Sequence, residues 1–471
     1  MKKSILSMCL VSLGLISSAA YAGSDGEISL IVKYKPQASA MNLKSSNNST
    51  YSVIAQQDLG KDKALVTVRP ENISVSTLTL APAVSAKEQE EEAAYQMARE
   101  FMESNPDVIY AIPSSSTMHA YGDVSTTAAT GVDVARWADQ WDMHNDGNGI
   151  GVEGAWQLVN NSKTYSTYAA VVDSGLAPQA PEDITKKLEV SATHYFYTDS
   201  NNKVVVSDNI TDNGSYHGTH VAGTIAADGP NVTGVAGPVD AVKVIPVRAL
   251  GDDGSGSTDA ILDAVQWAAG SAVDGVASNP YPAKVVNLSL GMSKPWYISD
   301  NSWKNNYMTT LCAAWGDTIN AVNGKGAVVV IAAGNDSQTL FNDIPSGCQN
   351  INAVVVEASG STGKLSFYST YDDPASWKVG SLVVRAPGGD SKIGGDAGEI
   401  LSTMNGGYGY MQGTSMATPH VVGIVSLIYA LNPDADVDYV RDILKHSAQS
   451  NGVLSAQLAV GNVLNSKIAA A

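Results

Sequence analysis

Cysteine and basic side chains are scarce in this chain, and each shortage narrows what the protein can be. The 471 residues include 28 lysines and arginines against 46 aspartates and glutamates, and the resulting net charge of −18 argues against a nucleic-acid partner. Charged residues make up only 16% of the chain and hydrophobic residues 44%, so the composition is globular rather than disordered and a large buried core is expected.

The N-terminus has the composition of an export signal. Lys2 and Lys3 precede an apolar run from residue 5 to residue 16, and Ala20-Tyr21-Ala22 has the A-x-A pattern of a cleavage site. The apolar run is too short to span a bilayer as a stable helix. We therefore expect a signal peptide over residues 1–22 and a protein that is secreted.

Only three cysteines occur, and Cys9 lies inside the export signal. Removal of the signal leaves Cys312 and Cys348. In an oxidising compartment an isolated pair most simply forms a disulfide, and two free thiols are the alternative.

The region after the signal predicts a small α+β domain. Short strands are expected at residues 28–34, 64–68 and 108–112, and residues 87–104 place their apolar side chains on one face of a helix. A polar gap over residues 42–52 predicts a loop. The Ser/Thr/Ala-rich residues 114–130 predict a linker open to proteolysis.

Past Trp137 the pattern changes to apolar strands that alternate with helices, such as the helix expected over residues 257–269. Strands that are continuously apolar indicate a parallel sheet covered on both faces, which predicts a three-layer α/β domain. In such sheets catalytic groups gather at the carboxyl ends of the strands. The strands are expected at residues 169–172, 242–247, 284–288, 327–331 and 352–356.

Ser415 lies in the stretch Gly413-Thr414-Ser415-Met416-Ala417-Thr418-Pro419-His420, ahead of a long apolar run. The pattern predicts a tight turn followed by a buried helix, with Ser415 at or beside the helix N-terminus. Unpaired N–H groups at a helix N-terminus can hold an oxyanion, so a serine there can act as a nucleophile. Taken alone, a serine before a helix is much more often only a capping residue.

Three more polar residues fall where chemistry is expected. Asp173 and Asn335 end predicted strands, and His217 opens the helix that begins His217-Gly218-Thr219-His220. Each alone also has an ordinary structural interpretation, because Asp, His and Asn are common in turns and caps.

Together these stretches resemble the subtilisin-like serine proteases, in the Asp, His, Asn, Ser order of that family. The resemblance extends over residues 140–448, and the two cysteines with Gln140-Trp141 are most similar to a secreted branch from Gram-negative bacteria. It implies a three-layer parallel-sheet catalytic domain over residues 137–471. It further implies a ferredoxin-like propeptide over residues 23–120 and a processing region over residues 121–136.

The resemblance also implies roles for single residues. Ser415 would be the nucleophile, His217 the general base, and Asp173 the group that orients the imidazole. His220 and His420 share the motifs but not that role. Asn335 would donate to the oxyanion, and in this family loss of that donor lowers kcat about 10²- to 10³-fold.

An extended substrate peptide is expected to pair with two strand edges. The pocket for the residue before the cut would be lined by three small residues, with Gly347 at its base. Because no carboxylate is evident there, we expect broad cleavage after large apolar residues. The predicted edges are Ser289-Leu290-Gly291 and Gly254-Ser255-Gly256, and the lining residues are Ala332, Ala333 and Gly334.

The same resemblance implies a structural calcium ion. Carboxylates of Glu182 and Asp183 would meet the loop over residues 228–235, since oxygen-rich loops suit a hard cation. A solvated polar turn is the alternative. The loop ligands would be Asp228, Asn231, Thr233 and Val235.

The sequence thus predicts a monomeric serine endopeptidase that acts on proteins or peptides, with its propeptide as intramolecular chaperone and inhibitor. No membrane association is expected once the signal is removed. A non-catalytic binding protein on the same scaffold is the first alternative, and the intact four residues argue against it. An esterase is the second, but that fold typically shows G-x-S-x-G and the order Ser, Asp, His.

Overall fold

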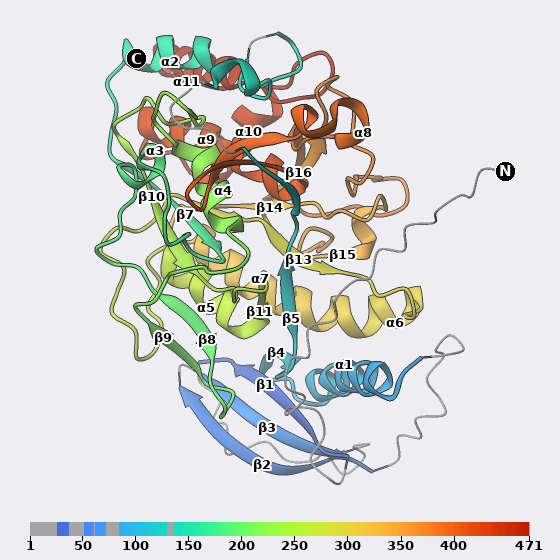
Figure 1. Ribbon diagram of the computed structural model, residues 1–471. Helices are drawn as coiled ribbons and strands as arrows, with labels where there is room; N and C mark the ends of the chain where they lie inside the picture. The colour runs from blue at the N-terminus through green and yellow to red at the C-terminus, as the bar shows by residue number, and fades with distance from the viewer. Residues whose placement is uncertain are drawn as a thin grey trace, which may run out of the picture.

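The structure is a computed structural model that describes residues 26–36, 51–60, 62–71, 84–129, 136–144 and 146–470. The predicted export signal, with Cys9, lies outside these ranges. Figure 1 shows a small sheet and one helix at one end of the molecule, next to a larger layered domain.

The small domain is a four-stranded antiparallel sheet in the order β2-β3-β1-β4, with helix α1 (Ala86–Ser104) on one face. The predicted strands and helix are confirmed; the described elements run β-β-β-α-β and include one of the two helices of the ferredoxin-like sequence β-α-β-β-α-β. The strands are β1 (Ile28–Tyr34), β2 (Tyr51–Gly60), β3 (Lys63–Pro70) and β4 (Val108–Pro113).

Strand β2 was not expected, because the sequence predicted a loop over residues 42–52 and no strand between that loop and residue 64. β2 lies at the edge of the sheet, and five consecutive residues in it, 54–58, are exposed. Its register against β3 also shifts twice. An exposed and irregular edge strand has no alternation of apolar side chains from which it could be recognised.

The large domain is built on an eight-stranded sheet in the order β17-β16-β14-β12-β7-β10-β8-β9. Seven strands are parallel, and only the edge strand β9 runs antiparallel to its neighbour. The strands are β7 (Thr167–Asp173), β8 (Tyr195–Thr198), β9 (Val204–Ser207), β10 (Val242–Arg248), β12 (Val285–Leu288), β14 (Val328–Ala332), β16 (Val354–Ser359) and β17 (Leu382–Pro387).

Successive residues of β7 show that helices cover both faces of this sheet. Ala169 and Val171 pack in one core with helices α4 (His217–Ala226) and α9 (Thr414–Leu431). Ala170 and Val172 pack in a second core with α5 (Thr258–Ala268) and α7 (Thr309–Asn323). Since neighbouring side chains of a strand point to opposite faces, the predicted three-layer arrangement is confirmed (Figure 1).

Helix α9 is long and apolar enough to cross a membrane by composition alone, but all of it is buried inside the protein. It contacts six strands of the large sheet, β7, β10, β12, β14, β16 and β17, and also helix α4. It is therefore the central core helix, and the residues at its N-terminus are held by the whole domain.

The segment between the two domains is not the open linker that its composition predicted. Strand β5 (Thr117–Ala120) lies between β11 (Ser255–Ser257) and β13 (Leu290–Ser293), antiparallel to both. Strand β6 (Asp123–Ala129) pairs with β19 (Gly407–Gln412). Both strands form because the large domain offers edges with unpaired backbone groups, which a local reading of residues 114–130 could not include.

Cys312 and Cys348 form the predicted disulfide, which is confirmed. It joins α7 to the loop that follows the two-residue strand β15 (Asp343–Ile344). The bond closes a chain segment with a sequence separation of 36 residues.

Opening this disulfide should lower stability. On the chain-entropy estimate a loop of this length contributes up to about 4 kcal/mol to the free energy of unfolding. Thermal unfolding of the mature protein, with and without reductant, should therefore show a lower Tm after reduction, and Cys312→Ser with Cys348→Ser should reproduce it. An equal Tm in all three samples, or two free thiols in the freshly secreted protein, contradicts this prediction.

Candidate active site

Asp173 and His217 meet at the carboxyl end of the sheet, where β7 ends and α4 begins. His217 Nδ1 lies 2.8 Å from Asp173 Oδ1 and 3.0 Å from Oδ2, and the backbone N–H of Ser174 donates to Oδ1 at 2.7 Å. Both side chains are almost completely buried. The carboxylate therefore fixes the tautomer of the ring, with the Nδ1 proton toward Asp173.

Close backbone contact explains why the residue after His217 is a glycine. A Cβ atom on Gly218 would lie 2.5 Å from the carbonyl oxygen of Gly175, and the Gly218 N–H donates to Ser174 Oγ at 2.9 Å. Helix α4 can thus begin against the turn that follows β7 only because residue 218 has no side chain. This close approach brings the His217 ring to Asp173.

Ser415 is the second residue of α9, so its N–H is among those that have no partner within the helix. Thr414 donates from both its N–H and its hydroxyl to Asn335 Oδ1, at 2.9 and 3.0 Å. These two bonds hold the side-chain oxygen of Asn335. The amide nitrogen of Asn335 therefore points to the same side as the Ser415 N–H. The two predicted oxyanion donors are thereby brought together.

The carbonyl oxygen of Tyr121 occupies this position. It accepts a hydrogen bond from Asn335 Nδ2 at 2.9 Å and from the Ser415 N–H at 3.3 Å. A Cβ atom on Gly413 would lie 2.4 Å from this oxygen, so only glycine at position 413 leaves room for it. A carbonyl between two converging donors is the arrangement that stabilises an oxyanion.

Strand β5, which leads to Tyr121, lies between the two predicted substrate edges (Figure 1). The N–H of Ala120 donates to Gly254 O at 3.0 Å, and the N–H of Tyr121 donates to Ser289 O at 3.1 Å. The other predicted residues of both edges pair in antiparallel register with β5; they are Ser255 and Gly256 on one edge and Leu290 and Gly291 on the other.

Two features separate this arrangement from an attacking geometry. Ser415 Oγ donates to Ser289 O at 2.9 Å, and among the described residues His217 Nε2 has no hydrogen-bond partner. A Cβ atom on Gly122 would lie 2.8 Å from His217 Cδ2 and 2.9 Å from Nε2. The residue after the Tyr121 carbonyl therefore lies directly against the imidazole.

The expectation that the pocket contains no carboxylate is wrong. The Tyr121 hydroxyl donates to Asp343 Oδ1, and Asp343 is fully buried. No side chain fits at Gly347, because a Cβ atom there would lie 2.0 Å from the carbonyl oxygen of Leu340 and 2.5 Å from that of Asp343, and its place at the base of the pocket stays a prediction. The expected Gly334 does adjoin Asp343, since its Cβ would lie 2.1 Å from Oδ2.

The other small residues expected at the pocket, Ala332 and Ala333, end β14 and follow it, and both are buried. Asp343 was missed because it forms β15 with only one other residue, which is too short for any periodic pattern. The pairing of β15 with β13, in which Asp343 lies opposite Ser293, brings its side chain to the pocket.

Two further histidines of the motifs are bound elsewhere. His220 Nε2 faces the carbonyl oxygens of Ile400 and Gly409 at 3.0 and 3.2 Å, and burial lowers the pKa of His220 to about 3. His420 places its two ring nitrogens 2.8 Å from Met416 O and from Asp142 Oδ2. Neither ring contacts Ser415 through a hydrogen bond that the structure describes.

The acidic residues predicted to bind calcium do not form a carboxylate cage. Glu182 is exposed, and Asp228 forms an ion pair with Lys186 at 3.2 Å. Asp183 is buried, and its Oδ2 accepts hydrogen bonds from the Val232 N–H and the Tyr408 hydroxyl. In the part of the chain that the structure describes, no three His, Cys, Asp or Glu residues cluster.

Two backbone carbonyl oxygens of the predicted calcium ligands also accept hydrogen bonds from side chains. The carbonyl of Thr233 accepts from Gln140 Nε2 at 3.0 Å, and that of Val235 from Trp156 Nε1 at 2.8 Å. Asn231 uses its amide nitrogen to donate to a tyrosine hydroxyl. Because these two carbonyl oxygens face N–H donors, and Asp183 Oδ2 faces an N–H and an O–H donor, the predicted residues as arranged do not fit a calcium ion.

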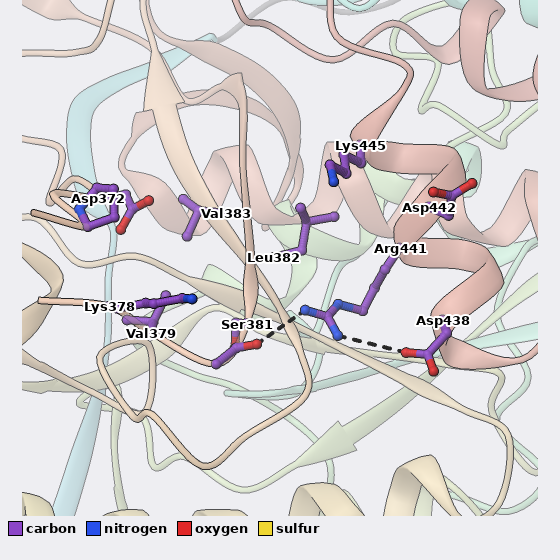
Figure 2. A pocket seen from close by; sticks show the side chains of 12 residues that line it. Asp372, Lys378, Val379, Ser381, Leu382, Val383, Asp438, Arg441, Asp442 and Lys445 are labelled. Carbon is purple, nitrogen blue, oxygen red and sulfur yellow. Dashed lines mark hydrogen bonds and ion pairs between the residues drawn. The ribbon is translucent and has the colours of Figure 1, made fainter.

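A separate cavity of about 540 Å³ lies between β17 and helix α10 (Val437–Lys445). Figure 2 shows that charges of both signs line it, with Lys378 and Asp372 on one side and Arg441 and Asp438 on the other. Arg441 donates to the carbonyl oxygen of Gly380 at 3.2 Å. None of the predicted site residues lines this cavity, so it is distinct from the Ser415 site.

Comparison with known proteins agrees with this geometry. The sequence pattern of the subtilase family matches residues 165–463. The chain is 32% identical over 368 residues to an "Extracellular protease" of Xanthomonas campestris pv. campestris, and 36% identical over 258 residues to an "Extracellular basic protease" of Dichelobacter nodosus. These matches cover 70% and 53% of this chain, but only 57% and 38% of those two relatives.

Among solved structures, a protease of Pseudoalteromonas arctica superposes with a TM-score of 0.57 and 33% identity. The match covers 70% of this chain and 98% of that one. The family pattern spans well over half of the sequence and contains His217, Asn335, Ser415 and Asp173. The chain therefore belongs to the subtilase family.

Proposed function

We propose that the protein is a secreted serine endopeptidase that hydrolyses peptide bonds through Asp173, His217 and Ser415, with Asn335 at the oxyanion. The single observation that supports this most strongly is the position of the Tyr121 carbonyl, held between Asn335 Nδ2 and the Ser415 N–H. A structural capping role for Ser415 does not require a peptide carbonyl at that point.

The reaction follows from the groups around this carbonyl. Ser415 Oγ attacks the carbonyl carbon while His217 Nε2 takes the hydroxyl proton, and Asp173 stabilises the imidazolium that forms. Asn335 and the Ser415 N–H hold the oxyanion. His217 then protonates the departing amine, which leaves an acyl-enzyme on Ser415, and a water molecule activated by His217 hydrolyses that ester.

The bond between Tyr121 and Gly122 is the first substrate on this proposal. It moves the predicted boundary of the propeptide from residue 120 to residue 121. Gly122 supports this assignment, since its missing Cβ would fall within 3 Å of the His217 ring. The bond lies in the described part of the predicted processing region, so cutting in cis needs no further movement of the chain into the site.

The N-terminal domain acts as chaperone and inhibitor on the same proposal. Its Lys63 inserts between Asp259 and Asp263 of α5, with Nζ to Oδ1 distances of 2.5 and 2.9 Å, and all three side chains are at most 10% exposed. Tyr95 of α1 stacks on Tyr307, with ring centroids 3.9 Å apart. Such contacts order the surface of α5 and of the helical turn Trp303–Met308 that leads into α7.

Export is proposed from the sequence of residues 1–22 and from the names of two relatives as extracellular proteases. The disulfide supports it, because such bonds persist in oxidising compartments.

Replacing the nucleophile should stop maturation. Ser415→Ala, expressed without other proteases, should accumulate as an uncut chain after signal removal, and a fluorophosphonate should no longer label it. The wild-type protein should yield a mature N-terminus at Gly122 by intact mass and N-terminal sequencing. Ser426→Ala is the matched control, because that serine lies on the same helix and its hydroxyl donates to Val422 O of the same helix.

A Ser415→Ala chain that still matures at Gly122 would assign the cut to another protease. Normal fluorophosphonate labelling of that variant would reject the nucleophile itself.

For the predicted calcium ion we infer the opposite of what the family resemblance suggests, namely that the loop over residues 228–235 is held by its own hydrogen bonds. Chelation by EDTA should change the Tm of the mature protein by less than about 2 °C, because the described residues contain no cluster of three His, Cys, Asp or Glu from which an ion would be lost on unfolding. Differential scanning calorimetry with EDTA and with added CaCl₂ measures this. A fall of about 10 °C that calcium reverses would contradict the inference.

A further inference from the structure

The side chain of Tyr121 fills the pocket beside the bond that we expect to be cut. Its hydroxyl donates to Asp343 Oδ1, with Tyr121 9% exposed and Asp343 fully buried. A Cβ atom on Gly291 would lie 2.5 Å from the tyrosine hydroxyl oxygen, and one on Gly334 would lie 2.1 Å from Asp343 Oδ2. Because residues 291 and 334 are glycines, the pocket has room for both the Tyr121 ring and the Asp343 carboxyl group that its hydroxyl contacts.

A purely structural role does not account for Asp343. Among the described residues no lysine, arginine or histidine pairs with it, and the hydroxyls of Ser293 and Thr370 are both 3.4 Å from Oδ2. A buried carboxyl group is costly unless close donors satisfy it. The one close donor described is the Tyr121 hydroxyl, which belongs to the segment that occupies the substrate cleft.

We propose that Asp343 determines the specificity of this peptidase, by selecting a side chain that carries a hydrogen-bond donor at the depth of the tyrosine hydroxyl. The inference rests on the proposed function and names its preferred substrate class, peptides cut after tyrosine. Phenylalanine fills the same space but leaves Asp343 without its close donor. Sites built to bind a hydroxyl reject such analogues, here by about tenfold to a hundredfold.

The charge of Asp343 adds a dependence on pH for basic side chains. Burial, and then the negative charge of the exposed Asp336, raises the pKa of Asp343 well above its ordinary value. Tyr121 is the other titratable group that faces it, while Ser293 and Thr370 carry no charge. Below the raised pKa the group is a neutral acid, which still accepts from tyrosine; above it the carboxylate also attracts lysine.

Cleavage after lysine should therefore rise relative to cleavage after tyrosine as pH increases. If Asp343 instead had a lowered pKa, it would be ionised throughout the working range, and the ratio of Lys to Tyr cleavage would not change with pH.

The test uses the mature wild-type enzyme and four p-nitroanilide peptides, acetyl-Met-His-Ala-Xaa, which copy residues 118–120 and end in Tyr, Phe, Leu or Lys. We expect kcat/KM for Tyr to exceed that for Phe and Leu by about tenfold or more. Asp343→Ala should bring the Tyr to Phe ratio to about one. Asp343→Asn keeps an acceptor oxygen, so it should retain part of that ratio and lose the rise of Lys cleavage with pH.

Asp336→Asn is the matched control. It removes a negative charge near Asp343, but the tyrosine hydroxyl donates to Asp343 and not to Asp336. It should leave the Tyr to Phe ratio unchanged. In the full-length chain, Tyr121→Phe removes only the hydroxyl and should slow release of the Gly122 N-terminus by a similar factor.

Equal kcat/KM for Tyr and Phe in the wild-type enzyme would overturn the role of Asp343, even if the Asp343 variants failed to fold. An unchanged ratio in a folded Asp343→Ala enzyme would overturn it too. Failure of the proposed function gives a different result, since then no peptide is cut and the fluorophosphonate leaves Ser415 unlabelled.

Discussion

The carbonyl oxygen of Tyr121, held by the Asn335 amide and the Ser415 N–H, is the contact on which the arrangement of the site depends. Two donors can converge on one oxygen only if both are fixed before it arrives. The core helix α9 fixes one, since every residue of the helix is buried. Thr414 fixes the other through two bonds to the Asn335 oxygen, and Gly413 leaves the space for the oxygen.

The register of β5 decides which carbonyl reaches that position. Met118 is fully buried and Tyr121 is nearly so. Thr117, which precedes Met118, and His119, which lies between the two, are exposed. Two buried anchors three residues apart allow only one register, because a shift by one residue would turn both side chains out of their pockets. Backbone pairing with β11 and β13 holds β5 in the cleft, and the two buried side chains fix its register there.

The four polar residues of the site could be identified from the sequence, because each lies in a short local pattern at the end of an apolar strand or the start of a helix. In a parallel sheet the carboxyl ends of all the strands lie at the same side, so the fold class alone brings such positions together. Asp343 and Tyr121 are 222 residues apart and share no such pattern. The strands β5 and β6 likewise form only against partners elsewhere in the chain, so composition alone suggested a linker.

On the proposed function, cutting one bond does not by itself free the site. The buried contacts of Lys63 with Asp259 and Asp263, and the stacking of Tyr95 on Tyr307, involve no atom of the Tyr121–Gly122 bond. Withdrawing Lys63 would also separate a buried cation from two carboxylates, which is costly before water can replace it. The severed domain therefore remains on the surface that it helped to order, with Tyr121 still in its pocket. Release requires that the small domain itself unfold or be digested, and its exposed edge strand β2 is where that is easiest.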